Sequence, residues 1–284
     1  MPNLIMHCNY FETGYSVETT FDKAVEHGYD GVEMRGRPRD ESMALDDYLD
    51  LVDKEKQRTG IEVVLALHGN YMTDDADERK AEVEHWGYVL KRGIDMGVTT
   101  YNAMCGGISP DDVDPREWDK CGSGAASDEH WKWATEAYQA LGAIAEAGGA
   151  RLAFETHMVA LTDIAAPTRK LLDMIDSPAV GANIDMGNIV LHPTGESLEE
   201  ALDILKGKIY YTHLKNVYIV PGGGWICCHI SDGVIDNYKF MEILKDQGYH
   251  GPIGLEAPRQ GDRNYFAKVD LAYIRSVVAD LDWD

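Results

Sequence analysis

Acidic and imidazole side chains stand at the ends of short apolar segments along this chain of 284 residues. Four of them come from the second half of the sequence, namely Glu155, Asp185, His213 and Glu256. Three carboxylates and one imidazole form a hard, mostly oxygen ligand set, which suits Mn²⁺, Mg²⁺ or Co²⁺ and could accept Zn²⁺. Without a metal, three converging carboxylates would repel one another, and some would have to bind protons. The four residues are therefore predicted to hold one divalent metal.

Three further polar residues end apolar segments nearer the start of the chain, namely His7, Glu33 and His68. Any one of them could be a solvated strand end or a buried group with satisfied hydrogen bonds, and for His7 or Glu33 alone this interpretation is equally favoured. Together with the four residues above, they make seven polar side chains at corresponding positions. That repetition favours one shared functional site.

Eight segments with strand character position these residues, and amphipathic helical patterns separate them. The predicted strands are Leu4–Cys8, Gly31–Met34, Glu62–His68, Thr99–Met104, Leu152–Glu155, Gly181–Asp185, Ile209–His213 and Ile253–Glu256. Eight β-then-α units without a glycine-rich dinucleotide motif predict an α/β fold, a parallel (β/α)8 TIM barrel; a doubly wound sheet is the alternative. In a barrel, the carboxyl ends of the strands converge on one site.

The helical patterns between the strands carry their own start and stop signals. Apolar residues recur every three or four positions, as in helices that cover a sheet with one face. The first such helix is predicted to begin after Ser16, whose hydroxyl can cap it, and to end at Gly28.

All residues from 1 to 284 are predicted to form a single domain. No stretch is long, charged or rich enough in proline and glycine to be a linker, and α/β barrels commonly run to about 250 residues as one domain. Residues 105–129 form a long polar insertion after the fourth strand. In a barrel this insertion falls on the catalytic face, so it is a candidate lid.

The composition excludes several classes of partner. The formal net charge is −23, which would repel phosphate backbones and anionic lipids, so neither nucleic acid nor a membrane is an expected partner. No stretch approaches the ~20 apolar residues of a membrane span, and no signal-like segment opens the chain, so a cytoplasmic location is expected. The five cysteines share no framework spacing and are expected to be free thiols.

Several segments of the sequence resemble one enzyme family. The sugar phosphate isomerase/epimerase superfamily, the xylose-isomerase-like TIM barrels, has strand ends similar to GYDGVEMRG, FETHMVALTD, NIDMGN, YTHLKN and YHGPIGLEAPR. The resemblance implies that Glu155, Asp185, His213 and Glu256 ligate one divalent metal. It also implies that the two glutamates act as acid and base on opposite faces of the substrate. The expected enzyme is an isomerase or epimerase of a small sugar or cyclic polyol ketone, working through a metal-stabilised enediolate.

The same ligand set serves other reactions, so alternatives stay open. The sequence ETH at 155–157, followed by LTD at 161–163, resembles the dehydroshikimate dehydratase pattern, in which the histidine contacts substrate. Asn188 stands where many epimerases and dehydratases have histidine, and an amide cannot relay a proton near neutral pH. A metal-dependent dehydratase of the dehydroshikimate or inosose type is the first alternative. An abasic-site endonuclease is disfavoured by the acidic surface, and a binding subunit without chemistry by the intact ligand set.

A second set of residues is predicted to contact the substrate. Its members are His7, Glu33, His68, His157, Asn188, Lys215 and Arg259. Lys215 lies two residues after His213 and is expected to point into the same mouth, because alternate strand residues share a side. For Lys215 and Arg259 a solvent-exposed position at the strand end is the equal alternative. A homo-oligomer is compatible with the sequence.

Overall fold

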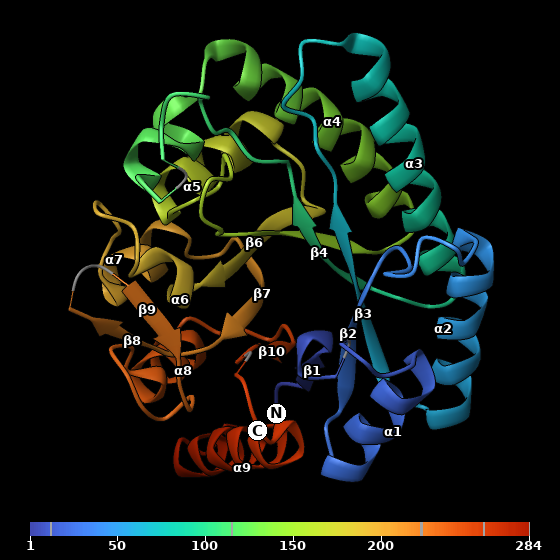
Figure 1. The fold of residues 1–284 in the computed structure, drawn as a ribbon, viewed down its shortest axis with the longest axis vertical. Helices are drawn as coiled ribbons and strands as arrows, with labels where there is room; N and C mark the ends of the chain where they lie inside the picture. The colour runs from blue at the N-terminus through green and yellow to red at the C-terminus, as the bar shows by residue number, and fades with distance from the viewer. Residues whose placement is uncertain (12, 115, 222–223, 258, 284) are drawn as a thin grey trace. The chain divides into compact units, whose positions relative to one another are not determined.

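Eight parallel strands close into a barrel in the order β1-β10-β7-β6-β5-β4-β3-β2 (Figure 1). The computed structural model describes residues 1–11, 13–114, 116–221, 224–257 and 259–283. The barrel strands are β1 (Leu4–His7), β2 (Gly31–Arg35), β3 (Glu62–His68), β4 (Thr100–Met104), β5 (Arg151–Glu155), β6 (Val180–Asp185), β7 (Ile209–Leu214) and β10 (Ile253–Leu255). The predicted parallel barrel is confirmed, and the doubly wound alternative is wrong because the sheet closes on itself.

Helices alternate with the barrel strands along the chain. They are α1 (Val17–His27), α2 (Leu45–Thr59), α3 (Ala76–Asp95), α4 (Asp128–Ala147), α5 (Ala165–Ile175), α6 (Met186–Ile189), α7 (Leu198–Ile204), α8 (Asn237–Asp246) and α9 (Arg263–Asp280), with short 3-10 turns at Cys8–Tyr10, Trp118–Lys120 and Gly122–Ala125. The ends of α1 are as predicted. The Ser16 hydroxyl accepts a hydrogen bond from the Thr19 amide at 3.2 Å, and Gly28 stops the helix with φ of 88°. Only glycine adopts that left-handed conformation without strain.

An antiparallel hairpin interrupts this alternation after β7. Its strands are β8 (Val217–Val220) and β9 (Gly224–Cys227), which form a separate two-stranded sheet. The sequence analysis predicted no strand there, because a short apolar run followed by proline and glycines does not fit the β-then-α repeat.

Two expectations from composition can be compared with the structure. The five cysteines are free thiols, and four of them are buried. Among the residues that the structure describes, no helix is both long enough and apolar enough to span a membrane.

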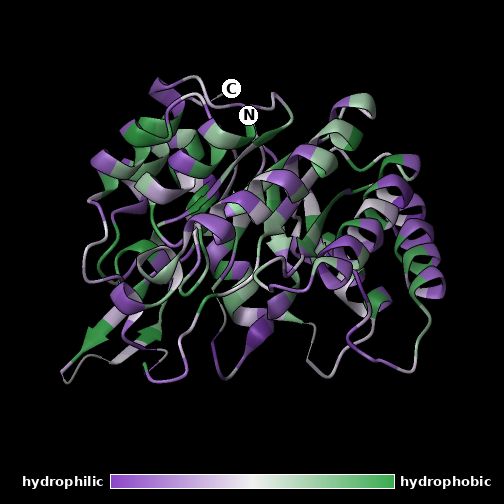
Figure 2. Ribbon diagram, turned by 90° about the horizontal axis from the view of Figure 1, so that it is seen from above, coloured by the Kyte–Doolittle hydropathy of each residue, from purple (hydrophilic) through white to green (hydrophobic). Residues whose placement is uncertain are grey.

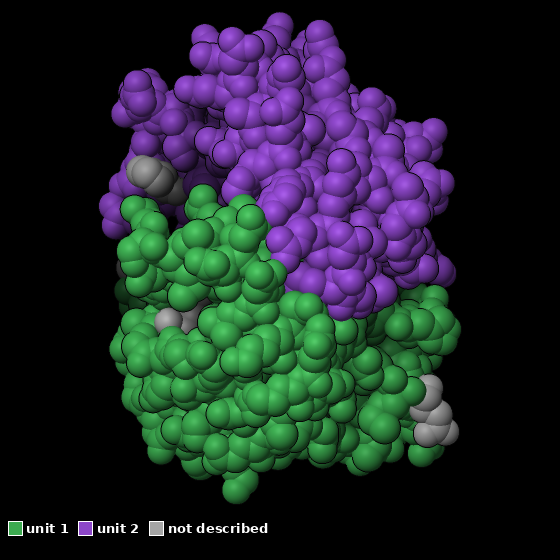
Figure 3. Space-filling model, turned by 90° about the vertical axis from the view of Figure 1, so that its right-hand side faces the viewer, with its two compact units in different colours: residues 1–65, 212–284 green, residues 66–211 purple. Residues whose placement is uncertain are grey.

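The chain divides into two compact units (Figure 3). Unit 1 comprises Met1–Leu65 and Thr212–Asp284, and unit 2 comprises Ala66–Tyr211. Unit 1 therefore contains β1, β2, β10, the hairpin and helices α1, α2, α8 and α9, whereas unit 2 contains β4 to β6 and helices α3 to α7. That all 284 residues form one domain stays a prediction.

The polar insertion at residues 105–129 is anchored within unit 2. Leaving aside residue 115, which lies outside the described residues, its backbone bonds to the loop after β5. The Ile108 amide donates to the Val159 carbonyl at 2.8 Å, and the Ser123 amide donates to the buried Asp163 carboxylate at 2.9 Å. These bonds give the insertion a defined packing, and its role as a lid stays a prediction.

Candidate metal centre

In unit 2, the carboxylates at the ends of β5 and β6 share one hydrogen-bond donor. Glu155 and Asp185 are both buried. The Asn188 side-chain amide lies 3.0 Å from Asp185 Oδ2 and 3.4 Å from Glu155 Oε1, and it also donates to the Thr156 carbonyl at 2.8 Å. One N–H group between two carboxylates reduces their repulsion only in part. The pair therefore retains a strong preference for a cation.

A second set of amides orients the other oxygen of Glu155. Asn102 Nδ2 donates to Glu155 Oε2 at 2.9 Å, and Asn183 Nδ2 donates to Asn102 Oδ1 at 3.0 Å. Both asparagines are fully buried, on β4 and β6, the two strands that flank β5. Each carboxylate oxygen still has a lone pair for a metal, because an oxygen that accepts one hydrogen bond can use its second lone pair. The sequence analysis missed Asn102 and Asn183, whose signal is an amide inside an apolar strand.

In unit 1, Glu33 at the end of β2 contacts the imidazole of His213 from β7. His213 Nε2 lies 2.8 Å from Glu33 Oε2, and both side chains are buried. Because a carboxylate only accepts, the tautomer with its proton on Nε2 donates to Glu33 and keeps a lone pair on Nδ1. Nδ1 lies 3.2 Å from Glu256 Oε2, so a metal ion or a proton on Nδ1 would bring these two acceptors together. Metal-binding histidines are commonly oriented in this way, with the second ring nitrogen donating to a carboxylate.

His7 reaches the other oxygen of the same glutamate. His7 Nδ1 accepts a hydrogen bond from the Asn9 amide at 3.1 Å, so its proton is on Nε2, 3.5 Å from Glu33 Oε1. The rings of His7 and His213 pack edge to face with their centroids 5.3 Å apart. These three side chains could also surround an ion. Glu33 already has one imidazole at hydrogen-bond distance and a second at 3.5 Å, so we describe the three residues as a support for His213.

Glu256, directly after β10, is held by a cation and an amide. Asn9 Nδ2 donates to Oε1 at 3.0 Å, and the buried Lys215 ammonium lies 3.4 Å from Oε2. Burial raises the pKa of Glu256, but Lys215, His7 and His213 outweigh it and hold the pKa well below its usual value. Glu256 is therefore an anion at neutral pH, available as a ligand or a base.

Three other residues that the sequence predicted to contact substrate have neighbours outside the set described above. His68 ends β3 and is half-buried, and His157 Nδ1 lies 3.0 Å from the Met158 carbonyl. The Arg259 guanidinium pairs with the buried Asp270 carboxylate of α9 and packs over the Phe266 ring at 4.3 Å. Substrate contacts by His68, His157 and Arg259 stay predictions.

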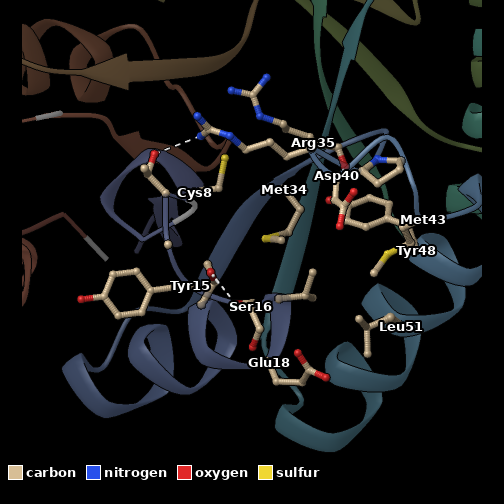
Figure 4. A pocket seen from close by; sticks show the side chains of 16 residues that line it. Cys8, Tyr15, Ser16, Glu18, Met34, Arg35, Asp40, Met43, Tyr48 and Leu51 are labelled. Atoms are coloured by element: carbon tan, nitrogen blue, oxygen red, sulfur yellow. Dashed lines mark hydrogen bonds between the residues drawn. The ribbon is translucent and has the colours of Figure 1, made fainter.

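A cavity of about 510 Å³ in unit 1 is lined by the end of β2, by the segments that follow β1 and β2, and by helices α1 and α2 (Figure 4). Its lining includes Cys8 and Met34, each of which directly follows a residue of the His213 support. Its lining includes none of His7, Glu33 and His213. It is distinct from the candidate metal centre.

Comparisons with known proteins agree with this fold. The model of the xylose isomerase-like TIM barrel family matches residues 21–277. An inosose dehydratase of Clostridium perfringens (strain 13 / Type A) is 24% identical over 275 residues, covering 84% of this chain and 83% of the relative.

Solved structures extend the comparison over nearly the whole chain. The D-psicose 3-epimerase of Clostridium cellulolyticum H10, solved with D-tagatose, superposes with a TM-score of 0.77 at 17% identity, covering 97% of this chain and 99% of that one. A xylose isomerase-like TIM barrel protein of Mycobacterium smegmatis, in complex with magnesium, gives a TM-score of 0.76 at 15% identity, covering 99% and 98%. The family match spans most of the sequence and the resemblance of the strand ends is thereby confirmed: the chain belongs to the xylose isomerase-like TIM barrel family.

Proposed function

We propose that Glu155, Asp185, His213 and Glu256 hold one divalent metal ion. Their strands β5, β6, β7 and β10 are consecutive in the barrel. The four form one of two groups of His, Asp and Glu among the described residues that could hold an ion. Their chemistry fits Mn²⁺, Mg²⁺ or Co²⁺, with Zn²⁺ also acceptable, and magnesium is bound by one structural neighbour.

Buried polar residues orient these side chains, as is typical of the ligands of a metal ion. Asn102 and Asn188 orient the carboxylate of Glu155 from two sides. Glu33 holds the His213 proton on Nε2 and so leaves Nδ1 for a metal. Each support is a buried polar residue at or near a strand end, where a purely structural role would be served by an apolar side chain at lower cost.

The function that this arrangement supports best is isomerisation or epimerisation of a small sugar or cyclic polyol ketone. The observation that carries it is the pair of glutamates in unlike surroundings, since Glu155 accepts from neutral amides and Glu256 lies beside Lys215. A bound divalent ion supplies Lewis acidity, which makes the C–H beside a carbonyl more acidic. One glutamate takes that proton, and the other returns a proton to a different face or carbon. Lys215 offsets the negative charge that Glu256 and the substrate bring together.

A lyase is the second candidate, and the inosose dehydratase match over 84% of the chain favours it. A dehydratase begins with the same proton abstraction but then expels a hydroxyl group. That step needs an acid for the departing oxygen, and Asn188 cannot supply one because an amide does not titrate near neutral pH.

One experiment separates the two reactions. The metal-loaded enzyme is incubated in D₂O with ketohexoses and inososes, and products are weighed by mass spectrometry. We expect deuterium at the carbon beside the carbonyl in a product of unchanged elemental formula. Glu155→Gln and Glu256→Gln should each abolish net conversion, although one of them can still permit exchange on a single face. A product lighter by one water would establish the lyase instead.

The matched control is Glu62→Gln. Glu62 is the first residue of β3, at the end of the strand opposite to the site, and its carboxylate accepts a hydrogen bond from the Asn3 side-chain amide. It should leave turnover unchanged. Turnover that survives both site substitutions would contradict the assignment of the glutamates.

A further inference from the structure

The side-chain amide of Asn9 offers one end to Glu256 and leaves the other end without a partner. Asn9 lies directly after β1 in the 3-10 turn Cys8–Tyr10, and its Nδ2 donates to Glu256 Oε1 at 3.0 Å. Its Oδ1 is buried, and no donor among the residues that the structure describes reaches it. The amide cannot be turned round, because two acceptor oxygens would then face each other. Unit 1 therefore holds an unused hydrogen-bond acceptor beside Glu256.

The turn that carries Asn9 is fixed on both sides. The Asn9 backbone amide donates to His7 Nδ1 at 3.1 Å, and the Tyr10 hydroxyl donates to Asp270 Oδ2 at 2.6 Å. Hydrophilic and hydrophobic residues are mixed along the helices, as Figure 2 shows, and Asp270 is a hydrophilic residue of α9 that is completely buried. These anchors keep the Asn9 oxygen from turning toward another donor of the chain.

An unused buried acceptor has a cost that a bound molecule can remove. Leaving such an oxygen unpaired lowers an equilibrium constant by about tenfold or more, so most buried polar side-chain atoms have a partner. Exceptions are expected at functional sites, where the partner belongs to a ligand. The position of Asn9 beside Glu256 makes it such an exception.

The neighbouring groups decide which ligand chemistry fits this oxygen. The partner must donate, which excludes an ionised carboxylate because it only accepts. A second cation is disfavoured by the Lys215 ammonium, which lies 3.4 Å from Glu256 Oε2. A hydroxyl group donates one hydrogen bond and brings no charge. Hydroxyl groups are also what the polyol ketones of the proposed function carry on most of their carbons.

We propose that Asn9 is a substrate-binding residue whose Oδ1 accepts a hydrogen bond from one hydroxyl group of the polyol. Its Nδ2 holds Glu256 at the same time, so a single amide links the position of the substrate to that of the glutamate. The polyol itself comes from the proposed function, on which this assignment rests. The assignment adds a specificity for a hydroxyl at one particular carbon, because an analogue without it leaves the buried oxygen unpaired.

The first test removes hydroxyl groups from the substrate one at a time. The value of kcat/KM is measured for D-fructose, for an inosose and for the monodeoxy derivatives of both, with the Mn²⁺-loaded wild type and with Asn9→Ala. Loss of the Nδ2 bond to Glu256 affects every substrate equally, whereas loss of Oδ1 affects only substrates that carry the bound hydroxyl. We expect Asn9→Ala to slow a parent substrate at least about tenfold more than one of its monodeoxy derivatives.

Asn3→Ala is the matched control for this comparison. The Asn3 side-chain amide also donates to a glutamate, Glu62, at 2.7 Å, but Asn3 directly precedes β1 whereas Asn9 follows it. The control should leave every value of kcat/KM unchanged.

The second test needs no turnover. Crystals of the Mn²⁺-loaded protein are soaked with myo-inositol, a cyclic polyol that has no carbonyl group and therefore binds without reacting. We expect one of its hydroxyl oxygens about 2.7 Å from Asn9 Oδ1. Calorimetric titration should show about tenfold weaker binding of myo-inositol to Asn9→Ala, and unchanged binding to Asn3→Ala.

Two results would overturn the assignment of Asn9. One is an equal loss of kcat/KM for a parent substrate and all of its monodeoxy derivatives, and the other is a crystal in which no myo-inositol hydroxyl lies within hydrogen-bond distance of Oδ1. If myo-inositol occupies Oδ1 but no ketohexose or inosose is converted, the binding role of Asn9 stands and the proposed reaction is wrong.

Discussion

Replacing Glu33 with glutamine tests whether this buried carboxylate orients the His213 imidazole for a metal. In the wild-type protein, Glu33 Oε2 lies 2.8 Å from His213 Nε2, and Oε1 lies 3.5 Å from His7 Nε2. Glutamine has nearly the same shape and can still accept from His213 through its one carbonyl oxygen, but it removes the negative charge. Its amide group can also donate, so the neutral side chain no longer dictates which nitrogen of His213 carries the proton.

The expected loss follows from the strength of that hydrogen bond. Hydrogen bonds to charged groups contribute about 1.5–3 kcal/mol, and neutral ones about 0.5–1.5 kcal/mol. The difference of about 1–1.5 kcal/mol corresponds to about a tenfold weaker metal affinity. Glu33→Leu removes the acceptor altogether and should weaken the metal affinity about a hundredfold. That is the upper end of the loss seen when a residue that supports a metal ligand is replaced.

The assay is calorimetric titration of metal-free protein with Mn²⁺ at neutral pH. Glu55→Gln serves as the matched control, because Glu55 is a buried glutamate of unit 1 that pairs with Arg58 on helix α2. It should alter stability and leave the Mn²⁺ affinity unchanged. If Glu33→Gln binds Mn²⁺ as tightly as the wild type while His213→Ala does not, the reasoning about the imidazole proton is wrong.

Three further predictions concern the ligands, the charge beside Glu256 and the stability of unit 1. Asp185→Asn should lose most of the one metal per chain, as measured by elemental analysis after dialysis, and full retention would contradict the ligand assignment. Lys215→Met removes a cation that lowers the pKa of Glu256, so the acid limb of the kcat/KM profile should move to higher pH; an unmoved limb would argue against Glu256 as the base. Asp270→Ala leaves the Arg259 guanidinium without its buried partner, and urea unfolding should show a loss of about 3–5 kcal/mol. Replacing both members with apolar residues should recover only the part of that loss that comes from the unpaired guanidinium, because the Tyr10 hydroxyl and the Ile230 amide also donate to Asp270; no recovery at all would show that the pair is not the cause.

The barrel and the strand-end residues could be predicted because both depend on local patterns. The apolar periods of strand and helix, and signals such as Ser16 and Gly28, act over a few residues, and the structure has strands at all eight predicted places. Parallel strands joined by helices bring their carboxyl ends to one side of the barrel. It was therefore enough to know which polar residues end a strand to predict that they lie on that side. The ligand assignment itself stays a prediction.

The contacts that support those residues depend on tertiary structure alone. Glu33 and His213 are 180 positions apart, and Asn102 and Asn183 are 81 apart. Whether such side chains meet depends on the register of the barrel strands, which apolar spacing does not specify. The same holds for the hairpin, since the apolar run at 217–220 would fit a buried strand equally well. Its exposure depends on what packs beside it, because burial is a property of the assembled surface and not of the residues themselves.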